Sequence, residues 1–149
     1  MFLTALRSIG AVITGLVVAF VLLAGIEVFS NVFHPFPPGV DPTDMEVCKA
    51  HVAQYPTSVL AVGATGWGLT VALSTALATR LGMGRHPAHG IVVGLLLYLA
   101  AIVNVLMLPY ATWFEVFCFV VLPLCIFAGV RLGRGAASPA NSGTPNLNG

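Results

Sequence analysis

Residues 27–56 read EVFSNVFHPFPPGVDPTDMEVCKAHVAQYP, and this polar stretch separates two long apolar segments. It holds four of the five acidic residues, the only lysine, two of the four histidines and five of the ten prolines. Elsewhere the chain is mostly apolar, since hydrophobic residues make up 58% of the sequence and charged residues 7%. A soluble domain carries about 25% charged residues, so the composition indicates an integral membrane protein with the lipid bilayer as its main partner.

The charge and cysteine content exclude two further classes. A formal net charge of +1 gives no basic field, so nucleic acid is not expected as a partner. Three cysteines in no paired pattern argue against a disulfide framework. We also find no nucleophile and base pair and no cofactor motif, so the sequence predicts no catalytic residue, no cofactor and no enzyme activity.

Four apolar segments are long enough to cross a bilayer, which takes about 20 helical residues. We expect these spans at residues 9–29, 58–79, 91–108 and 113–132. A cleaved signal peptide is the alternative for the first segment, but its apolar run is too long and no small-x-small cleavage site follows Ala24 before Glu27. The expected fold is therefore all-α, a polytopic bundle of four transmembrane helices.

The expected domain organisation has two parts. Residues 1–134 form the transmembrane domain, with a loop at residues 30–57 between the first and second spans. Residues 135–149 are rich in Gly, Ser, Pro and Asn and carry no charge, which predicts a disordered cytoplasmic tail.

The charges alternate along these four spans. The arginines fall on one side of the membrane and the acidic residues on the other: Arg7, Arg80, Arg85, Arg131 and Arg134 against Glu27, Asp41, Asp44, Glu46 and Glu115. Because positive loops stay on the cytoplasmic side, we expect both termini in the cytoplasm and residues 30–57 outside.

The loop at residues 30–57 should contain a short amphipathic helix over residues 42–54, ended by Pro56. Two N-caps are possible: Asp41 followed by Pro42, or Thr43 with Glu46 three residues later. The apolar face, turned toward lipid or the bundle, would comprise Met45, Cys48, Val52 and Tyr55, with His51 off this face.

Small residues on the spans mark close helix contacts or, in the alternative, reflect the general tolerance of membrane helices for small residues. The first span carries Gly10, Ala11, Thr14, Gly15 and Ala19, and the third begins with the GxxxG pattern Gly90–Gly94. Trp67 falls in the middle of its span, where packing against a neighbouring helix is preferred over stacking on a ligand. Pro123 should kink the fourth span.

Three polar residues are expected at similar depth near the outer surface: Glu27, Asn104 and Glu115. Polar groups near hydrocarbon face the bundle interior, so they could converge on one pocket that binds a cation or a proton. In the alternative, both glutamates extend separately to headgroup water. Asn104 should also hydrogen-bond across helices.

A weaker candidate lies in the loop itself, where His34, Asp41, Asp44 and His51 could hold a divalent metal or another ligand. Helix capping and solvation are the preferred roles for the two carboxylates, so we assign no metal site.

Three runs carry a resemblance: HPFPPGVDPTDME at residues 34–46, RHPAHGIVVGLLL at residues 85–97 and LPYATWFEV at residues 108–116. They resemble an uncharacterised group of small bacterial four-span membrane (hypothetical) proteins. The resemblance covers most of the chain outside the tail. It implies the same topology and a bacterial inner-membrane location, and it transfers no activity or functional residue.

Function is accordingly expected to be non-enzymatic. The leading hypothesis is a packing or accessory module that associates with copies of itself or with a membrane partner protein through its small-residue faces. The alternative is a small proton- or cation-coupled transporter or channel that uses the outer-leaflet carboxylates.

Overall fold

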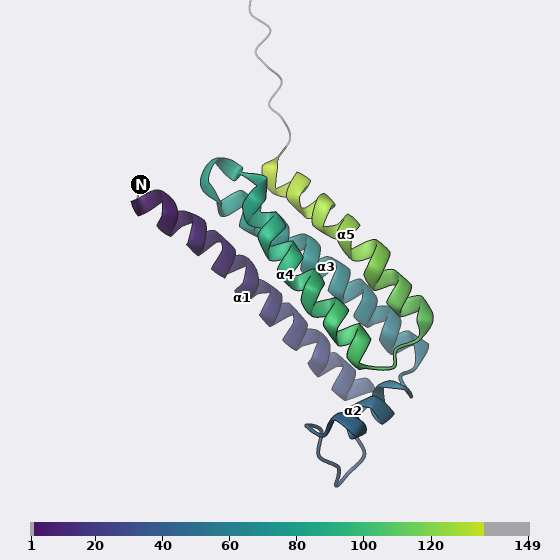
Figure 1. The fold of residues 1–149 in the computed structure, drawn as a ribbon. Coiled ribbons are helices and arrows are strands. Elements are labelled where there is room, and N and C mark those ends of the chain that lie inside the picture. Colours follow the sequence, from purple (N-terminus) through teal and green to yellow (C-terminus); the bar gives the residue numbers. More distant parts are fainter. Residues whose placement is uncertain (1, 136–149) are drawn as a thin grey trace, which may run out of the picture.

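Four long helices make up most of the chain (Figure 1). The computed structural model describes residues 2–135, in which every regular element is helical: α1 (Phe2–Phe33), α2 (Met45–Val52), α3 (Thr57–Leu81), the 3₁₀ turn η1 (Met83–Arg85), α4 (Pro87–Met107) and α5 (Thr112–Arg134). The four long helices have the length and composition to cross a membrane. The chain is therefore a multi-pass, all-α membrane protein, as expected. The prediction for the tail falls outside the described residues, apart from Gly135.

Helix α3 is the centre of the bundle. It packs against α1, α4 and α5, and α4 also packs against α5 and α1. About 44% of the apolar window of α3 is buried, compared with 17% for α1, which lies along one side of the other three helices (Figure 1). The exposed surface of α1 is mostly apolar, as lipid contact requires.

Glycines allow the closest helix approaches. Gly129 and Gly133 of α5 lie directly against the backbone carbonyl oxygens of Ala72 and Ala76 on α3, where a Cβ atom would overlap them. Gly90 of α4 lies in the same way against α3. The 129–133 pair has the same GxxxG spacing as the 90–94 pair and makes the closer approach to α3 through backbone atoms.

The small residues of α1 are divided between two surfaces. Ala11, Gly15 and Ala19 are buried, and Gly15 contacts Ala78 of α3. Gly10 instead faces open space. The small-residue faces of both α1 and α4 are thus used largely for packing within the chain.

Pro123 lies inside the continuous helix α5. Proline has no amide hydrogen, so the carbonyl of Phe119 one turn earlier loses its helical donor. The Tyr98 hydroxyl of α4 donates to that carbonyl at 3.5 Å, which replaces the missing bond with a link between α4 and α5.

Helix α1 extends beyond the predicted span at both ends. It continues through residues 30–33, where the Ser30 carbonyl still accepts the His34 amide at 2.8 Å. The helix ends before Pro35, because proline disfavours helical backbone in the residue that precedes it. Apolar length predicts the part of a helix inside hydrocarbon, and hydrogen bonding continues the helix past that boundary.

Helix α2 is shorter than predicted and has a different N-cap. Asp44 caps it, since its carboxylate accepts the Glu46 amide at 2.8 Å. Both predicted caps were wrong, because the Asp41 carboxylate accepts the amide and hydroxyl of Thr43 in the turn before the helix. Those two hydrogen bonds, the hydroxyl's foremost, hold the pKa of Asp41 below its usual value.

The buried face of α2 also differs from the predicted stripe. Val52 is buried as expected, but Met45 is 42% exposed and His51, placed off the apolar face, is only 6% exposed. The reason is that the preceding loop folds back, so that Phe36 and His34 cover the His51 ring.

Candidate binding site

A cavity of about 230 Å³ lies among the four long helices, in the half of the bundle nearer α2. Its floor is buried and is formed by residues such as Thr70, Val71 and Leu122, whereas Glu27 of α1 and Ala100 of α4 are exposed. The cavity therefore opens sideways between α1 and α4, toward lipid. The full lining comprises Leu23, Glu27, Trp67, Thr70, Val71, Leu97, Ala100, Ala101, Asn104 and Leu122.

The polarity of this cavity changes along the bundle axis. Glu27 and Asn104 lie at the end nearer α2, and the lining further along α4 is Ala101, Ala100 and Leu97. Asn104 and Leu97 are seven residues apart, or about 10 Å at 1.5 Å per residue. The cavity thus has a polar end near the surface and an apolar end near the middle of the bundle, where the Thr70 hydroxyl is the remaining polar group.

Two oxygen acceptors at the polar end are not paired within the described chain. Asn104 Oδ1 is buried without a hydrogen-bond partner, so the expected bond across helices is not formed. Leaving such a group unsatisfied costs about 1–3 kcal/mol, which makes it a strong acceptor for a ligand that reaches it. Glu27 has neither a hydrogen bond nor a cation within 4 Å among residues 2–135; the one salt bridge there joins Lys49 to Glu46.

Trp67 forms the wall between this cavity and a smaller one. Its ring packs edge-to-face on Phe114 of α5 with centroids 5.4 Å apart, which agrees with the predicted helix packing. Trp67 and Glu27 both line the smaller cavity of about 30 Å³, together with Ser30, Tyr55 and Tyr110. Sequence reasoning left Trp67 and Thr70 out of the site, although the position of a tryptophan in mid-span was a usable signal.

The two tyrosines keep their protons at neutral pH. Burial, with a smaller contribution from the Glu27 carboxylate, raises the pKa of Tyr55 above its usual value. Burial raises the pKa of Tyr110 more strongly, and the neighbouring Tyr55 and Glu27 act in the same direction. The surroundings of Glu27 are therefore neutral hydroxyl and amide groups, with no positive charge among the residues that line either cavity.

Glu115 lies elsewhere. It lines a separate surface depression between α4 and α5, in which Lys49 and Phe119 also take part. The structure thus brings together two of the three residues of the predicted polar site, Glu27 and Asn104, and leaves Glu115 outside it.

The four residues of the candidate loop site do not form one group: the two histidines lie together and the two aspartates bind elsewhere. His34 and Phe36 stack on His51, with centroid distances of 4.5 and 3.8 Å, and Tyr55 meets both histidines edge-on at 5.2 Å. The Asp41 and Asp44 carboxylates bind turn and cap amides instead. Within residues 2–135, His, Cys, Asp and Glu side chains form no group of three that could hold a metal ion.

His51 is the buried centre of this aromatic cluster. Its Nε2 atom has no hydrogen-bond partner. Burial, followed by the neighbouring His34, lowers the pKa of His51 below its usual value, so the ring is neutral at pH 7. All four rings of the cluster belong to the segment between α1 and α3, so the cluster ties the two ends of this loop together around a neutral imidazole.

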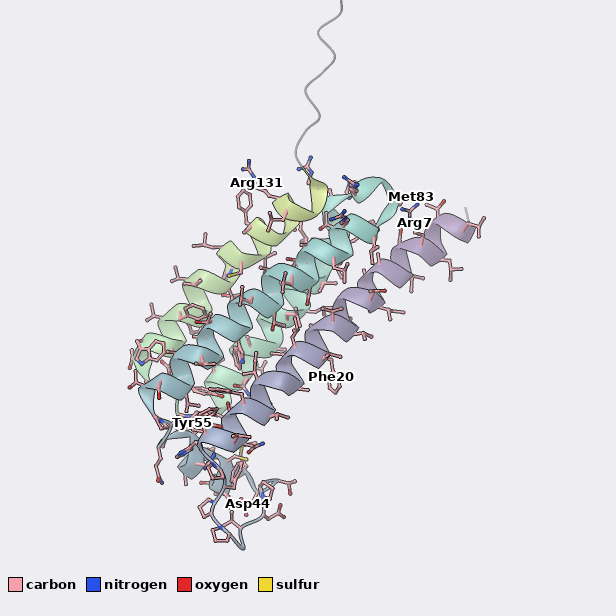
Figure 2. The ribbon with its side chains drawn as sticks, turned by 180° about the vertical axis from the view of Figure 1, so that it is seen from behind. Arg7, Phe20, Asp44, Tyr55, Met83 and Arg131 are labelled. Atoms are coloured by element: carbon pink, nitrogen blue, oxygen red, sulfur yellow. The ribbon has the colours of Figure 1, made fainter. Side chains whose placement is uncertain are left out.

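The arginines and the other two histidines lie at or near the opposite ends of the long helices. Figure 2 shows Arg7 and Arg131 at the end of the bundle far from Asp44 and Tyr55. There the Arg7 guanidinium donates to the Leu81 carbonyl at 3.2 Å. His86 Nδ1 accepts the Ala88 amide as the N-cap of α4, which gives that histidine a structural role.

No protein-family model, no curated protein and no solved structure matches this chain. Its function has to be inferred from the geometry of the cavity.

Proposed function

We propose that this chain is a non-enzymatic, accessory membrane protein that binds a small amphipathic molecule in the cavity between α1 and α4. The observation that carries the proposal is the one-sided polarity of that cavity. Its unpaired acceptors, Glu27 and Asn104, lie near the membrane surface and its apolar lining extends inward. An amphipathic molecule in one leaflet of a bilayer is oriented in the same way, with its polar head at the membrane surface and its apolar body inside.

The size and access of the cavity support the same proposal. Ligand pockets are mostly apolar with a few polar groups that fix orientation, and drug-sized ligands need about 300–1,000 Å³. A volume of about 230 Å³ suits a smaller molecule or one end of a longer one. Because the opening faces sideways between α1 and α4, the ligand would enter from the lipid phase.

Association through the small-residue faces is less well supported. Gly15 of α1 and Gly90 of α4 already lie against α3, so these positions are not free for a partner. A transport role is also less well supported, because Gly129 and Gly133 bring α5 into direct contact with the α3 backbone in the half beyond the cavity. A binding site in one leaflet is consistent with this close contact.

The proposed location is a bacterial inner membrane with both termini in the cytoplasm. In support, the starts and ends of the four spans put the arginines at one end of the bundle (Figure 2). The cavity would then lie in the outer leaflet, beneath the loop that holds α2.

Trp67 offers a direct test. A Trp113→Phe variant leaves Trp67 as the single tryptophan, and a Trp67→Phe variant leaves Trp113, which is 41% exposed on α5, as the control. In a neutral detergent, bromooctanol should quench Trp67 in a saturable manner because bromine quenches on contact. Quenching of Trp113 should rise without saturation, since it reports partition into the micelle.

A blocking substitution completes this test. Ala100→Phe fills the mouth of the cavity from an exposed position, and Val103→Phe adds the same ring to an exposed position of α4 that does not line the cavity. Saturable quenching should disappear in the first variant and persist in the second. Non-saturable quenching of Trp67 in the parent would refute the proposed binding role.

A further inference from the structure

The ligand class can be inferred from the hydrogen-bonding groups of the cavity, on the premise of the proposed function. We infer that the preferred ligand is a hydrophobic amine whose protonated nitrogen binds between Glu27 and Asn104. Both residues line the polar end of the cavity, and each carries an oxygen acceptor that has no partner within the described chain. A protonated amine is a compact cation that only donates hydrogen bonds, so it complements a carboxylate and an amide oxygen.

The absence of basic residues from the lining argues against ligands with a phosphate or carboxylate head group. No lysine, arginine or histidine lines the cavity, and the single lysine, Lys49, is bonded to Glu46 at 2.8 Å. A phosphate or carboxylate head would face the Glu27 carboxylate with no cation to balance its charge. Acidic lipids and fatty acids are therefore poor ligands for this cavity.

Trp67 adds a second feature that favours a cation. Indole is the side chain whose ring face attracts cations most strongly, and Trp67 lines the cavity together with Glu27. The apolar body of the amine would then lie along Leu97, Val71 and Leu122, toward the middle of the bundle. Head and body are thus both accommodated by residues that the structure brings to one cavity.

The experiment compares three probes that share a chain and differ in the head: bromooctylamine, bromooctanol and bromooctanoate. Each is titrated into the protein with Trp67 as its single tryptophan, in neutral detergent at neutral pH. The quenching of Trp113 in the matched variant corrects for partition into the micelle. We expect half-saturation by the amine at a roughly tenfold lower concentration than by the alcohol, the difference typical of a charge-assisted hydrogen bond. The carboxylate should not saturate.

Two matched substitutions test whether Glu27 is responsible for the preference for the amine. Glu27→Gln should remove the advantage of the amine, so that amine and alcohol reach half-saturation at similar concentrations. Glu115→Gln removes a carboxylate that lines a different depression, and should preserve the advantage of the amine. Equal effects of the two substitutions would show that general surface charge attracts the amine, and would overturn the assignment to Glu27.

The outcomes separate this inference from the proposal on which it rests. If the alcohol saturates Trp67 quenching as readily as the amine does, the cavity binds amphiphiles without preference for a cation and the inference fails alone. If neither probe saturates, the proposed binding role fails and the inference fails with it. Comparison of amine and alcohol in the parent protein requires no substitution at Glu27, so the test stands even if the Gln variant is unstable.

Discussion

An alanine at position 129 would place a methyl group against the backbone of α3. The added Cβ would overlap the Ala72 carbonyl oxygen and Thr75 Oγ1. The Thr75 hydroxyl is already bonded to the Val71 carbonyl at 2.8 Å, and the Ala72 carbonyl is part of the helix backbone. Neither group can rotate away at low cost, so α3 and α5 would have to separate by roughly 1 Å to restore ordinary contact.

The expected free-energy change combines two opposing terms. Overpacking of a close contact costs about 1–3 kcal/mol, and we expect the upper end because backbone atoms are involved. Alanine is favoured over glycine in a helix by about 1 kcal/mol. Gly129→Ala should therefore destabilise the bundle by about 2 kcal/mol.

The matched control is Gly63→Ala. Gly63 is buried on α3, yet a Cβ built there has no atom within 4 Å. This variant should gain about 1 kcal/mol from helix propensity, which puts the two variants about 3 kcal/mol apart. Reversible unfolding in mixed micelles with increasing dodecyl sulfate, followed by circular dichroism, measures the difference. Stabilities equal to within about 0.5 kcal/mol would refute the close approach of α3 and α5.

Three further predictions concern the loop and the topology. First, because the folded-state pKa of His51 lies below its unfolded value of about 6.5, its contribution to stability is present above that pH and lost as the pH falls below it. The protection factors of the α2 amides, which correct the exchange rates for the intrinsic pH dependence of amide exchange, should fall between about pH 7 and pH 5 in the parent and not in a His51→Phe variant; an equal fall in both would contradict this. Second, Asp44→Ala should cost the local stability of α2 about 1 kcal/mol through loss of the N-cap, whereas Thr43→Ala should have a smaller effect on the Glu46 amide. Exchange rates at Glu46 and Val47 measure both, and an equal response to the two substitutions would argue against Asp44 as the cap. Third, a variant that retains Cys48 alone should react with a membrane-impermeant maleimide in intact spheroplasts, whereas a Met83→Cys variant that lacks the native cysteines should react only after lysis; the reverse pattern would invert the proposed topology.

The spans could be predicted from the sequence because each depends on one property, the length of an apolar run. Residues 58–79 and 113–132 lie within α3 and α5 as the structure has them. Cap and turn geometry were harder to predict, because Asp41, Thr43 and Asp44 are all good capping residues and compete within four positions. The choice among them depends on how the loop folds back onto His51, and this fold cannot be predicted from the residues around the cap.

The candidate site could be predicted only in part, for a geometric reason. Depth in the membrane follows from the position of a residue along its helix, so the sequence could group Glu27, Asn104 and Glu115 by their nearness to one end of their spans. Convergence on one cavity also requires that each helix be rotated to face it, and rotation is set by packing. Glu27 and Asn104 meet across α1 and α4, whereas Glu115 faces the depression between α4 and α5.

The peripheral place of α1 sets the order in which this protein can assemble. Its main packing surface is α3, and α3 is held in turn by α4 and α5, which follow it along the chain. Because α1 is synthesised before α3, it lies beside lipid until α3 has joined it in the membrane. Since α1 also supplies Leu23 and Glu27 to the cavity, that cavity forms only when α1 has packed against the other three helices.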